Sequence, residues 1–565
     1  MDENASSPDM ISELPDFILH QILSFLPVKA AAKTCVISKR WCRIWETFPI
    51  VDCCQFYFGK YLDIVNPKEL GLPKDVRRNI FEQRVKFMSY IDDKLGRISE
   101  NDICVKKFRL VMTLVSVGLF PRVDFWMDLV SELKVQELEL RLTLGRERFY
   151  ALPVKVLASQ SLTVLSLKGC ILIDCLSKDD VKFSSLVELH LHGSIIDEEA
   201  ISNLVSSIHS LEVLSLKSCL GFTRLEIHGH KKLKKVVYHP HMALKIKKIS
   251  INLPNLEELE VMFSSRPKRR LAFIRGLLIP NLKRLSLCGV FVDGKSLRDI
   301  VLSFPLLERL FLGECFVREA ANLKSSILKE IYLRNCSNAV KAEFDTPGLR
   351  VFKYYSKDMS HLSINNVAGN RIAELPVPLS DMDSSWFKKL NNFLVKNRFH
   401  ELILILSITD GQSAENTFSP ENRIRKRLPQ PFELKSMKLV IYAFTSVKYA
   451  PLLDGLFWNL HPKTLKLELH YNSPTYVKGL LKSLIVSEEP KCCQTVHKEN
   501  LKCWRHSLKG IKFANVKGFQ TGTSLDLCTL NSLNNFLDNW SIETQRTLDC
   551  YETVEGAKMS FDLSW

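Results

Sequence analysis

Long apolar runs are missing from the sequence, which contains none that could cross a lipid bilayer as a helix. Its longest apolar runs, such as LILILSI at 402–408, fall far short of the ~18–20 residues that a membrane-spanning helix needs. The first residues, MDENASSPD, are acidic and Ser-rich and lack the basic and apolar regions of a secretory signal. We therefore expect a soluble protein without a membrane partner, located in the nucleus, the cytoplasm or both.

Familiar catalytic motifs are missing too. We recognise no GxSxG, Walker loop, HExxH or strand-to-helix GxGxxG motif, the spacings that position a nucleophile, a metal or a phosphate group in the corresponding enzymes. Scattered His and Asp residues occur in any chain of 565 residues and do not define a site. We therefore expect a protein that is not an enzyme and needs no cofactor, with a hydrolase or transferase as the alternative.

Paired CxxC motifs are absent as well, although the sequence contains 16 cysteines. In an intracellular protein we expect these thiols to be reduced. Five of them follow an apolar LxL triplet, and this regular placement predicts a small packed side chain at one structural position. These five are Cys170, Cys219, Cys288, Cys315 and Cys336.

A cluster of soft metal ligands lies near the C-terminus. It consists of Cys492, Cys493, His497, Cys503 and His506. Adjacent cysteines replace the C-x2-C spacing of zinc fingers, and no second CxxC motif follows. We therefore predict no metal site and interpret the cluster as a loop that closes the C-terminal end, with zinc binding as the alternative.

The sequence is strongly basic, with 78 Lys and Arg against 62 Asp and Glu, a formal net charge of +16. The densest clusters are HKKLKK at 230–235, KIKK at 245–248, RPKRR at 266–270 and RIRKR at 423–427. We interpret most of them as solvated outer faces. An acidic partner such as nucleic acid, or a nuclear import signal, is the alternative, although aromatic residues are not interleaved with the basic ones as in nucleic-acid modules.

The middle of the chain repeats an LxxLxL pattern, as in LTVLSLKGC at 162–170 and LEVLSLKSC at 211–219. The first residue of the central apolar pair falls at 138, 165, 189, 214, 236, 259, 285, 310, 331 and 351, so the spacings run from 20 to 27 residues. A period in this range with this core is the signature of leucine-rich repeats. An ordinary α/β domain with similar strands is the alternative.

Each repeat predicts a short strand with one buried face, because apolar residues alternate. The segment SIIDEEAISNLVSSIHS at 194–210 has a helical pattern and would return along the opposite side. No single unit buries its apolar row alone, so the units must stack into a solenoid. Residues between the buried leucines face the open surface and are candidates for substrate binding: Ser166, His190, Ser215, Ser286 and Phe311.

The N-terminal segment predicts three short helices. Pro15 suits the start of the first helix and Pro27 ends it. The Ala-rich VKAAAKTCVI forms the second, and Ser38 is the N-cap of a third that places Trp41 and Trp45 on one face. Three helices in about 40 residues bury too little surface to be stable alone, so part of their apolar area must contact the repeats or another chain.

This segment, LPDFILHQILSFLPVKAAAKTCVISKRWCRIW at 14–45, resembles the F-box. It shares the LP pairs and the SKRW signature of that family, with Ile37 in place of the usual Leu. The resemblance implies docking onto a Skp adaptor, which links F-box proteins to a cullin and a RING subunit. We expect Trp45 to be a core residue. The implied adaptor contacts are Leu14, Pro15, Leu19, Ile22, Leu23, Leu26, Pro27, Val28, Val36, Ser38 and Trp41.

The C-terminal segment resembles the FBD domain, which follows the F-box and leucine-rich repeats in many plant proteins. The resemblance rests on PLLDGLFWNLHPKTLKLEL at 451–469 and EEPKCCQTVHKENLKCWRHSLKGIKFANVKGF at 488–519. The fold class that follows is α/β: a three-helix F-box, a leucine-rich-repeat solenoid and a C-terminal α+β FBD domain. The expected boundaries are 1–10 disordered, 11–52 F-box, 53–130 helical linker or cap, 131–356 repeats, 357–430 degenerate repeats and linker, and 431–565 final strands and FBD domain.

By this resemblance the protein is the substrate-recognition subunit of a Skp–cullin–F-box ubiquitin ligase. The F-box would hold the adaptor, and the repeats would hold an unknown target protein for ubiquitination. Catalysis would then come from proximity and orientation and not from side chains of this chain. A repeat scaffold that acts without a cullin, or a basic repeat protein that binds an acidic partner such as nucleic acid, is the alternative.

Overall fold

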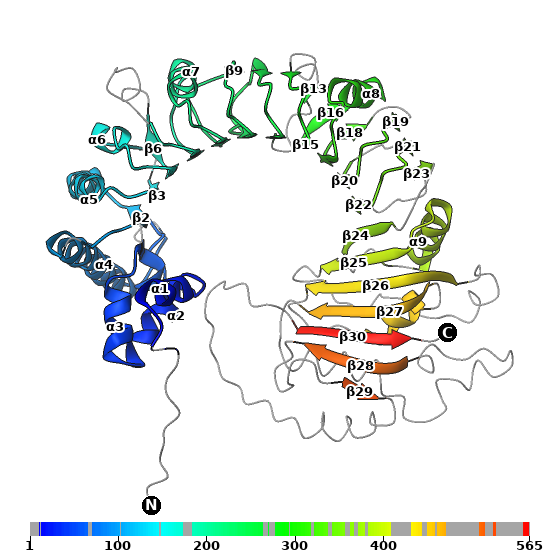
Figure 1. Ribbon diagram of the computed structural model, residues 1–565, viewed down its shortest axis with the longest axis horizontal. Coiled ribbons are helices and arrows are strands. Elements are labelled where there is room, and N and C mark those ends of the chain that lie inside the picture. The colour runs from blue at the N-terminus through cyan, green and yellow to red at the C-terminus, as the bar shows by residue number, and fades with distance from the viewer. Residues whose placement is uncertain are drawn as a thin grey trace, which may run out of the picture. The chain divides into compact units, whose positions relative to one another are not determined.

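The structure is a computed structural model that divides the chain into two compact units (Figure 1). The first unit comprises 1–266 and 272–282, and the second comprises 267–271 and 283–565. The described residues are 11, 13–65, 70–101, 103–145, 149–172, 184–263, 269–270, 277–292, 294–317, 321–336, 342–355, 362–365, 371–378, 382, 384–407, 431–442, 449–457, 460–469, 508–514, 524–526 and 557–563. The N-terminal segment 1–10, predicted to be disordered, lies outside them.

The first unit begins with the three predicted helices. They are α1 (Asp16–Ser24), α2 (Val28–Lys33) with the following 3-10 turn η1 (Thr34–Val36), and α3 (Lys39–Glu46). Pro15 and Pro27 stand at the N-cap positions of α1 and α2 with extended ψ angles, which start each helix. The Ser38 hydroxyl accepts a hydrogen bond from the Trp41 amide at 3.2 Å and caps α3 as predicted.

Eight parallel strands form the main sheet of the first unit, each paired with the next repeat. They are β1 (Ile50–Cys54), β2 (Lys107–Leu114), β3 (Glu137–Leu144), β5 (Val164–Lys168), β7 (Glu188–His192), β8 (Val213–Lys217), β10 (Lys235–His239) and β12 (Glu258–Met262). The strands expected from the LxxLxL pattern are confirmed. The sheet nevertheless starts at Ile50, well before the predicted repeat boundary at residue 131.

The segment 53–130, expected to be a helical linker or cap, combines helices with a strand of the sheet. Its helical elements are η2 (Gln55–Tyr57), α4 (Lys74–Glu100), η3 (Val117–Leu119) and α5 (Phe120–Glu132). Between them, KFRLVMTL forms β2 because Phe108, Leu110, Met112 and Leu114 alternate with outward residues and are buried. The first repeat is therefore built from residues that precede the recognisable repeats.

A second layer lies on the other side of the apolar row. Its helices α6 (Val154–Leu157) and α7 (Glu198–Ser207) lie with α5 on one side of the strands (Figure 1), and α7 confirms the helical prediction for 194–210. Short parallel strands complete this layer: β4 (Tyr150–Ala151) with β6 (Cys170–Ile171), and β9 (Arg224–His228) with β11 (Lys248–Asn252) and β14 (Leu277–Leu278). The Asp197 carboxylate caps α7 by accepting a hydrogen bond from the Ala200 amide at 2.7 Å.

The core of the first unit consists of two rows of side chains stacked from strand to strand. Each of these side chains is at most 2% exposed, and their burial stabilises the fold by about 1.5–3 kcal/mol for each large apolar residue. The rows are Leu138, Leu165, Leu189, Leu214, Val236 and Leu259, and Leu140, Leu167, Leu191, Leu216, Tyr238 and Val261.

The cysteines after the strands are packed as predicted, with one exception. Cys170, Cys219, Cys315 and Cys336 are buried, whereas Cys288 is partly exposed. The thiol of Cys219 donates to the Leu191 carbonyl of the preceding strand at 3.5 Å. A small side chain with a weak donor therefore fits the point where the chain leaves the sheet.

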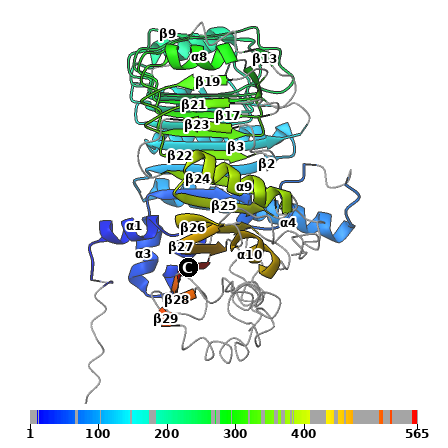
Figure 2. The ribbon, with the colours of Figure 1, turned by 90° about the vertical axis from the view of Figure 1, so that its right-hand side faces the viewer.

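The second unit repeats this construction over eight further parallel strands. They are β15 (Arg284–Cys288), β17 (Arg309–Gly313), β20 (Glu330–Arg334), β22 (Val351–Tyr355), β24 (Ile372–Pro378), β25 (Glu401–Ser407), β26 (Phe432–Tyr442) and β27 (Leu460–Leu469). Its outer strands are β13 (Arg269–Arg270), β16 (Val290–Val292), β18 (Phe316–Val317), β19 (Ala321–Lys324), β21 (Ala342–Asp345) and β23 (Leu362–Asn365), and its helices are α8 (Gly294–Ser303), α9 (Ser384–Asn397) and α10 (Tyr449–Phe457). Figure 2 shows α9 lying across β24 and β25.

The repeats continue past the point where their sequence pattern fades. The described parts of 357–430, expected to be degenerate repeats and a linker, contain β23, β24, α9 and β25. After β27 the sheet changes direction: β30 (Ala557–Leu563) pairs antiparallel with β27 and with β28 (Leu508–Ala514), and β28 pairs antiparallel with β29 (Ser524–Asp526). Added strands of this kind cover the edge that a stack of parallel strands leaves open.

In the part of the chain that the structure describes, no helix is both long enough and apolar enough to cross a membrane.

Two glycines at equivalent turns allow a matched test of the stacking. Gly169 and Gly193 both have positive φ angles, +76° and +50°. A Cβ at Gly169 would lie 2.3 Å from the Leu142 carbonyl oxygen of the neighbouring repeat, whereas a Cβ at Gly193 would meet nothing within 4 Å. We expect Gly193→Ala to cost only the left-handed backbone penalty of about 1–2 kcal/mol. Gly169→Ala should cost clearly more, because the neighbouring backbone must move.

The midpoint of urea unfolding, monitored by circular dichroism, measures the stability of both variants. Equal midpoints for Gly169→Ala and Gly193→Ala would show that the repeats are not packed as closely as described.

Candidate functional site

The F-box segment has a small core of its own. The buried side chains are Leu19, Leu23, Ala31, Trp41, Ile44 and Phe48, each at most 5% exposed. Leu14, Ile22, Trp45 and Ile50 are partly buried and pack against this core. Three residues that the resemblance assigned to the adaptor interface, Leu19, Leu23 and Trp41, therefore lie in the chain's own core and have no side-chain surface for a partner.

The other predicted adaptor contacts retain accessible surface. Pro15, Leu26, Pro27 and Val36 are exposed, and Leu14, Ile22, Val28 and Ser38 are partly exposed. The hydroxyl of Ser38 is already used as the cap of α3.

Three exposed apolar residues of this segment were not predicted as contacts. They are Phe17, Phe25 and Ile37, which are 69%, 79% and 58% exposed. Leu26 and Val36 are exposed as well, at 38% and 88%. We call these five residues the exposed F-box cluster. Large apolar side chains left in water on α1 and η1 and directly after them indicate a partner surface. The sequence signal was present, because Phe17 breaks the polar side of α1.

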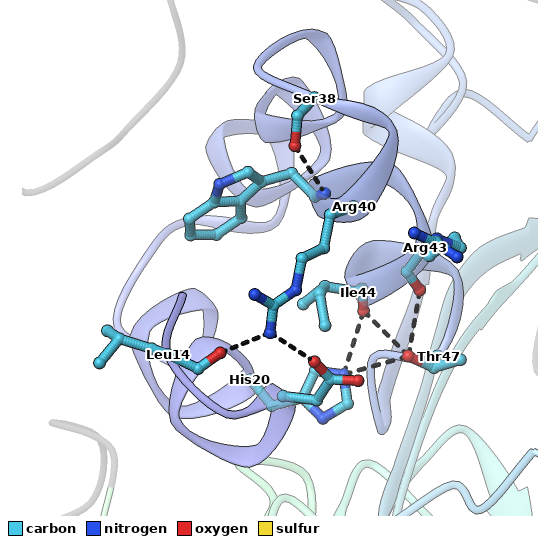
Figure 3. Close-up of polar contacts among 9 residues, drawn as sticks. Leu14, His20, Ser38, Arg40, Arg43, Ile44 and Thr47 are labelled. Carbon is cyan, nitrogen blue, oxygen red and sulfur yellow. Dashed lines mark hydrogen bonds and ion pairs between the residues drawn. The ribbon is translucent and has the colours of Figure 1, made fainter. Parts of the chain in front are cut away.

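Polar contacts hold α1 against α3 (Figure 3). Arg40 donates to the Leu14 carbonyl and to the Asp16 carboxylate, the latter at 2.9 Å. His20 Nε2 lies 3.1 Å from the Ile44 carbonyl oxygen and 3.2 Å from the Thr47 hydroxyl. Because Arg40 binds the backbone immediately before Pro15, the start of α1 is held in a fixed position on the surface.

The F-box helices continue into the repeat sheet without a linker. The Pro49 carbonyl accepts hydrogen bonds from the amides of Lys106 and Lys107 at 2.8 and 3.1 Å, and β1 then pairs with β2. Trp45 stacks on Phe48 with ring centroids 5.7 Å apart, and the Lys94 ammonium group of α4 lies 5.9 Å from the Trp45 ring. Burial lowers the pKa of Lys94. Trp45, expected in the core, thus packs partly buried between the F-box and α4.

The predicted substrate-binding residues fall into two groups. Ser166, His190 and Ser215 are direct neighbours in register on β5, β7 and β8 of the first unit. Ser166 and His190 are partly exposed, whereas Ser215 is only 5% exposed and offers little surface. His190 Nε2 lies 3.0 Å from the Glu188 carboxylate on the same strand.

In the second unit, Ser286 and Phe311 are neighbours in register on β15 and β17. The Phe311 ring meets the Tyr332 ring of β20 edge to face, with centroids 4.7 Å apart. The residues of each group are therefore adjacent: the first group is polar, and the second places a serine beside a phenylalanine.

Contrary to the expectation that the sequence has no Walker loop, residues 289–296 match the phosphate-binding loop pattern GxxxxGK[S/T]. A phosphate-binding loop requires free backbone amides between the two glycines. Here three of the four positions between the glycines, Val290–Val292, form β16, which pairs in parallel with β13 and β18, and Val290 is fully buried. The sequence matches the motif, but the segment does not adopt the loop conformation and therefore does not indicate a nucleotide site.

The C-terminal cysteine and histidine cluster, residues 492–506, lies outside the described residues. Among the residues that are described, no group of three His, Cys, Asp or Glu side chains is placed to hold a metal ion.

Comparisons with known proteins match the two regions described above. The F-box domain model matches residues 11–52, and a model described as "FBD-associated F-box protein At5g56370, LRR repeats" matches residues 123–274. Neither matched region is a catalytic domain. The chain therefore contains an N-terminal F-box segment followed by a region of leucine-rich repeats.

Similar curated proteins come from Arabidopsis thaliana. F-box/LRR-repeat protein At3g59190 is 30% identical over 265 residues, which are 46% of this chain and 63% of the relative. Putative F-box/LRR-repeat protein At4g00320 is 28% identical over 333 residues, 55% and 60% of the two chains, and putative F-box/FBD/LRR-repeat protein At4g03220 is 28% identical over 225 residues, 39% and 40%. The chain is thus similar to plant F-box/leucine-rich-repeat proteins, and one of these relatives carries FBD in its name. It spans less than two thirds of the length of each of these three relatives.

The division of the F-box into core and surface residues is testable with two truncations. Leu23→Ala removes a fully buried side chain, and we expect it to lower the free energy of unfolding by about 2–5 kcal/mol. Val36→Ala removes an exposed side chain and should change stability by less than about 0.5 kcal/mol. Urea unfolding of the full chain, monitored by its tryptophan fluorescence, measures the free energy of unfolding of both variants. A Val36→Ala variant as unstable as Leu23→Ala would contradict the division.

Proposed function

We propose that the protein is the substrate-recognition subunit of a Skp–cullin–F-box ubiquitin ligase. The F-box would bind the Skp adaptor, the adaptor would join the cullin and RING subunits, and the repeats would bind a target protein. The observation that carries the proposal is the exposed F-box cluster, a set of solvated apolar side chains on and directly after α1 and η1.

The role of the chain in this complex is positional. The F-box passes directly into β1, so a target held on the repeat strands of the first unit keeps a fixed orientation to the adaptor. Restricting the separation of two reactive groups raises their effective concentration without new chemistry. Within the described residues we find no group of side chains arranged for a catalytic step. The proposed role of the chain is therefore that of a non-catalytic adaptor.

Two further parts of the proposal rest on sequence resemblance. The C-terminal region is proposed to be an FBD domain, supported by the antiparallel strands β27, β28, β29 and β30 and by FBD in the printed name of one relative. The proposed location is the nucleus, the cytoplasm or both, where the ubiquitin ligase subunits would be available.

Adaptor binding is tested by placing a charge in the exposed F-box cluster. Phe25→Asp should weaken binding to a purified Skp adaptor about ten- to hundredfold, since burying a Phe side chain contributes about 1.5–3 kcal/mol. The matched control is Phe81→Asp, an exposed Phe on α4 that is 67% exposed and lies outside the F-box. Binding is measured by calorimetry with the full chain.

The double replacement of Leu14 and Pro15 by Ala tests the other part of the surface. It should abolish co-purification with the adaptor while the circular dichroism of the repeats stays unchanged. If both the double variant and Phe25→Asp bind the adaptor as tightly as Phe81→Asp, the proposed docking surface is wrong.

A further inference from the structure

A row of basic side chains crosses five neighbouring strands of the first unit. Each residue directly follows a buried core residue and pairs in register with the next, so all five lie on the face opposite the core. We call this row the basic ladder. Its members, on β3, β5, β7, β8 and β10, are Arg141, Lys168, His192, Lys217 and His239.

The two ends of the basic ladder are compensated by carboxylates. Arg141 Nε lies 2.5 Å from Glu139, and His239 Nε2 lies 2.5 Å from Glu260. The pKa of Glu260 is lowered, first by the hydrogen bond with His239 and also by the nearby charge of Lys217. The carboxylates of Glu139 and Glu260 are therefore already paired with Arg141 and His239.

The centre of the basic ladder is not compensated. In the described part of the chain, neither Lys168 nor Lys217 makes an ion pair with a carboxylate. They stand on either side of His192, in direct register with it. The nearest carboxylate on these strands, Glu188, contacts His190 at 3.0 Å. The two lysines thus present unpaired positive charge on either side of His192.

The direction of the His192 pKa shift agrees with this charge distribution. Its pKa is lowered by partial burial and then by the charges of Lys168, Lys217, Arg141 and His239. Four basic neighbours acting on one exposed histidine show that the field at the centre of the ladder is positive. A negative group bound there would relieve the repulsion among these side chains.

We propose that the basic ladder binds an extended acidic segment of the target protein, with carboxylates seated between Lys168, His192 and Lys217. This inference rests on the proposed function, in which the repeats hold a target. Neighbouring strands are about 4.8 Å apart, so the five rungs span only about 19 Å. A segment with a few separated carboxylates matches this length and the charges at its centre.

Nucleic acid fits the same surface less well. Glu139, Glu188 and Glu260 lie in or beside the row behind the ladder and would repel a continuous chain of phosphates. The in-register residues behind the three central rungs are Ser166, His190 and Ser215, and none of them offers a large aromatic ring for stacking bases. Discrete carboxylates are therefore the better complement.

The test uses the full chain and a fluorescein-labelled peptide of alternating Glu and Gly, with fluorescence anisotropy as the readout. Lys168→Glu/Lys217→Glu should weaken peptide binding about tenfold or more, because both reversals place negative charge at the contact. The matched control is Lys231→Glu/Lys232→Glu, which makes the same change of net charge at exposed positions outside the ladder. The peptide affinity of the control variant should stay within about twofold of that of the unchanged protein.

Two outcomes overturn the proposal. One is equal weakening by the ladder variant and the control, which would reduce the effect to net charge. The other is ladder-dependent binding of a single-stranded oligonucleotide in the same assay without ladder-dependent binding of the peptide, which would assign the surface to nucleic acid.

Skp adaptor binding by the same variants separates this inference from the proposed function. If the adaptor binds normally but the ladder variant binds the peptide as tightly as the unchanged protein does, only the inference fails. If the peptide depends on the ladder but the unchanged protein binds no adaptor, only the proposed function fails.

Discussion

The structure of the first unit depends on one constraint, the parallel pairing of each strand with the next in a constant register. Because side chains alternate along a strand, this register places every LxL pair in the two buried rows and every intervening residue on the open face. A slip of one residue in any repeat would put leucines in water and charges in the core. The same constraint creates the basic ladder, since residues 22 to 27 positions apart in the sequence become direct neighbours.

The F-box is tied to this constraint because its last helix leads straight into β1. The strand IVDCC pairs with KFRLV of β2, and Arg109 of β2 donates two hydrogen bonds to Asp52 of β1 at 2.9 and 3.0 Å. The docking helices are thus the first part of the stacked structure and not a separate module on a linker. This arrangement gives a physical reason why a non-catalytic chain can orient a bound target toward a partner.

Local signals in the sequence predicted the helix starts and most strands. Pro15, Pro27 and Ser38 act through their own backbone or side chain, so their effect needs no knowledge of the fold. The LxxLxL period likewise predicts strands from neighbouring residues alone. The strands β1 and β2 were not predicted, because IVDCC and KFRLVMTL become strands by pairing with repeats that follow later. The F-box surface was predicted only in part: Leu19 and Ile22 look alike in the sequence, and only packing against α3 shows that Leu19 is buried and Ile22 partly exposed.

The central claim is that the F-box and the first repeats form one rigid body, and a distance distribution tests it most directly. Spin labels can be introduced through unnatural amino acids at Lys39 on α3 and at Arg224 on β9, both of which are exposed, so the native cysteines stay unchanged. A pair at Arg141 and Arg224, within the repeats, provides the reference width. Pulsed dipolar spectroscopy should give a single distance distribution for Lys39 and Arg224 that is as narrow as the reference. A broad distribution or several distances for that pair alone would show that the F-box moves independently of the repeats and would contradict the account.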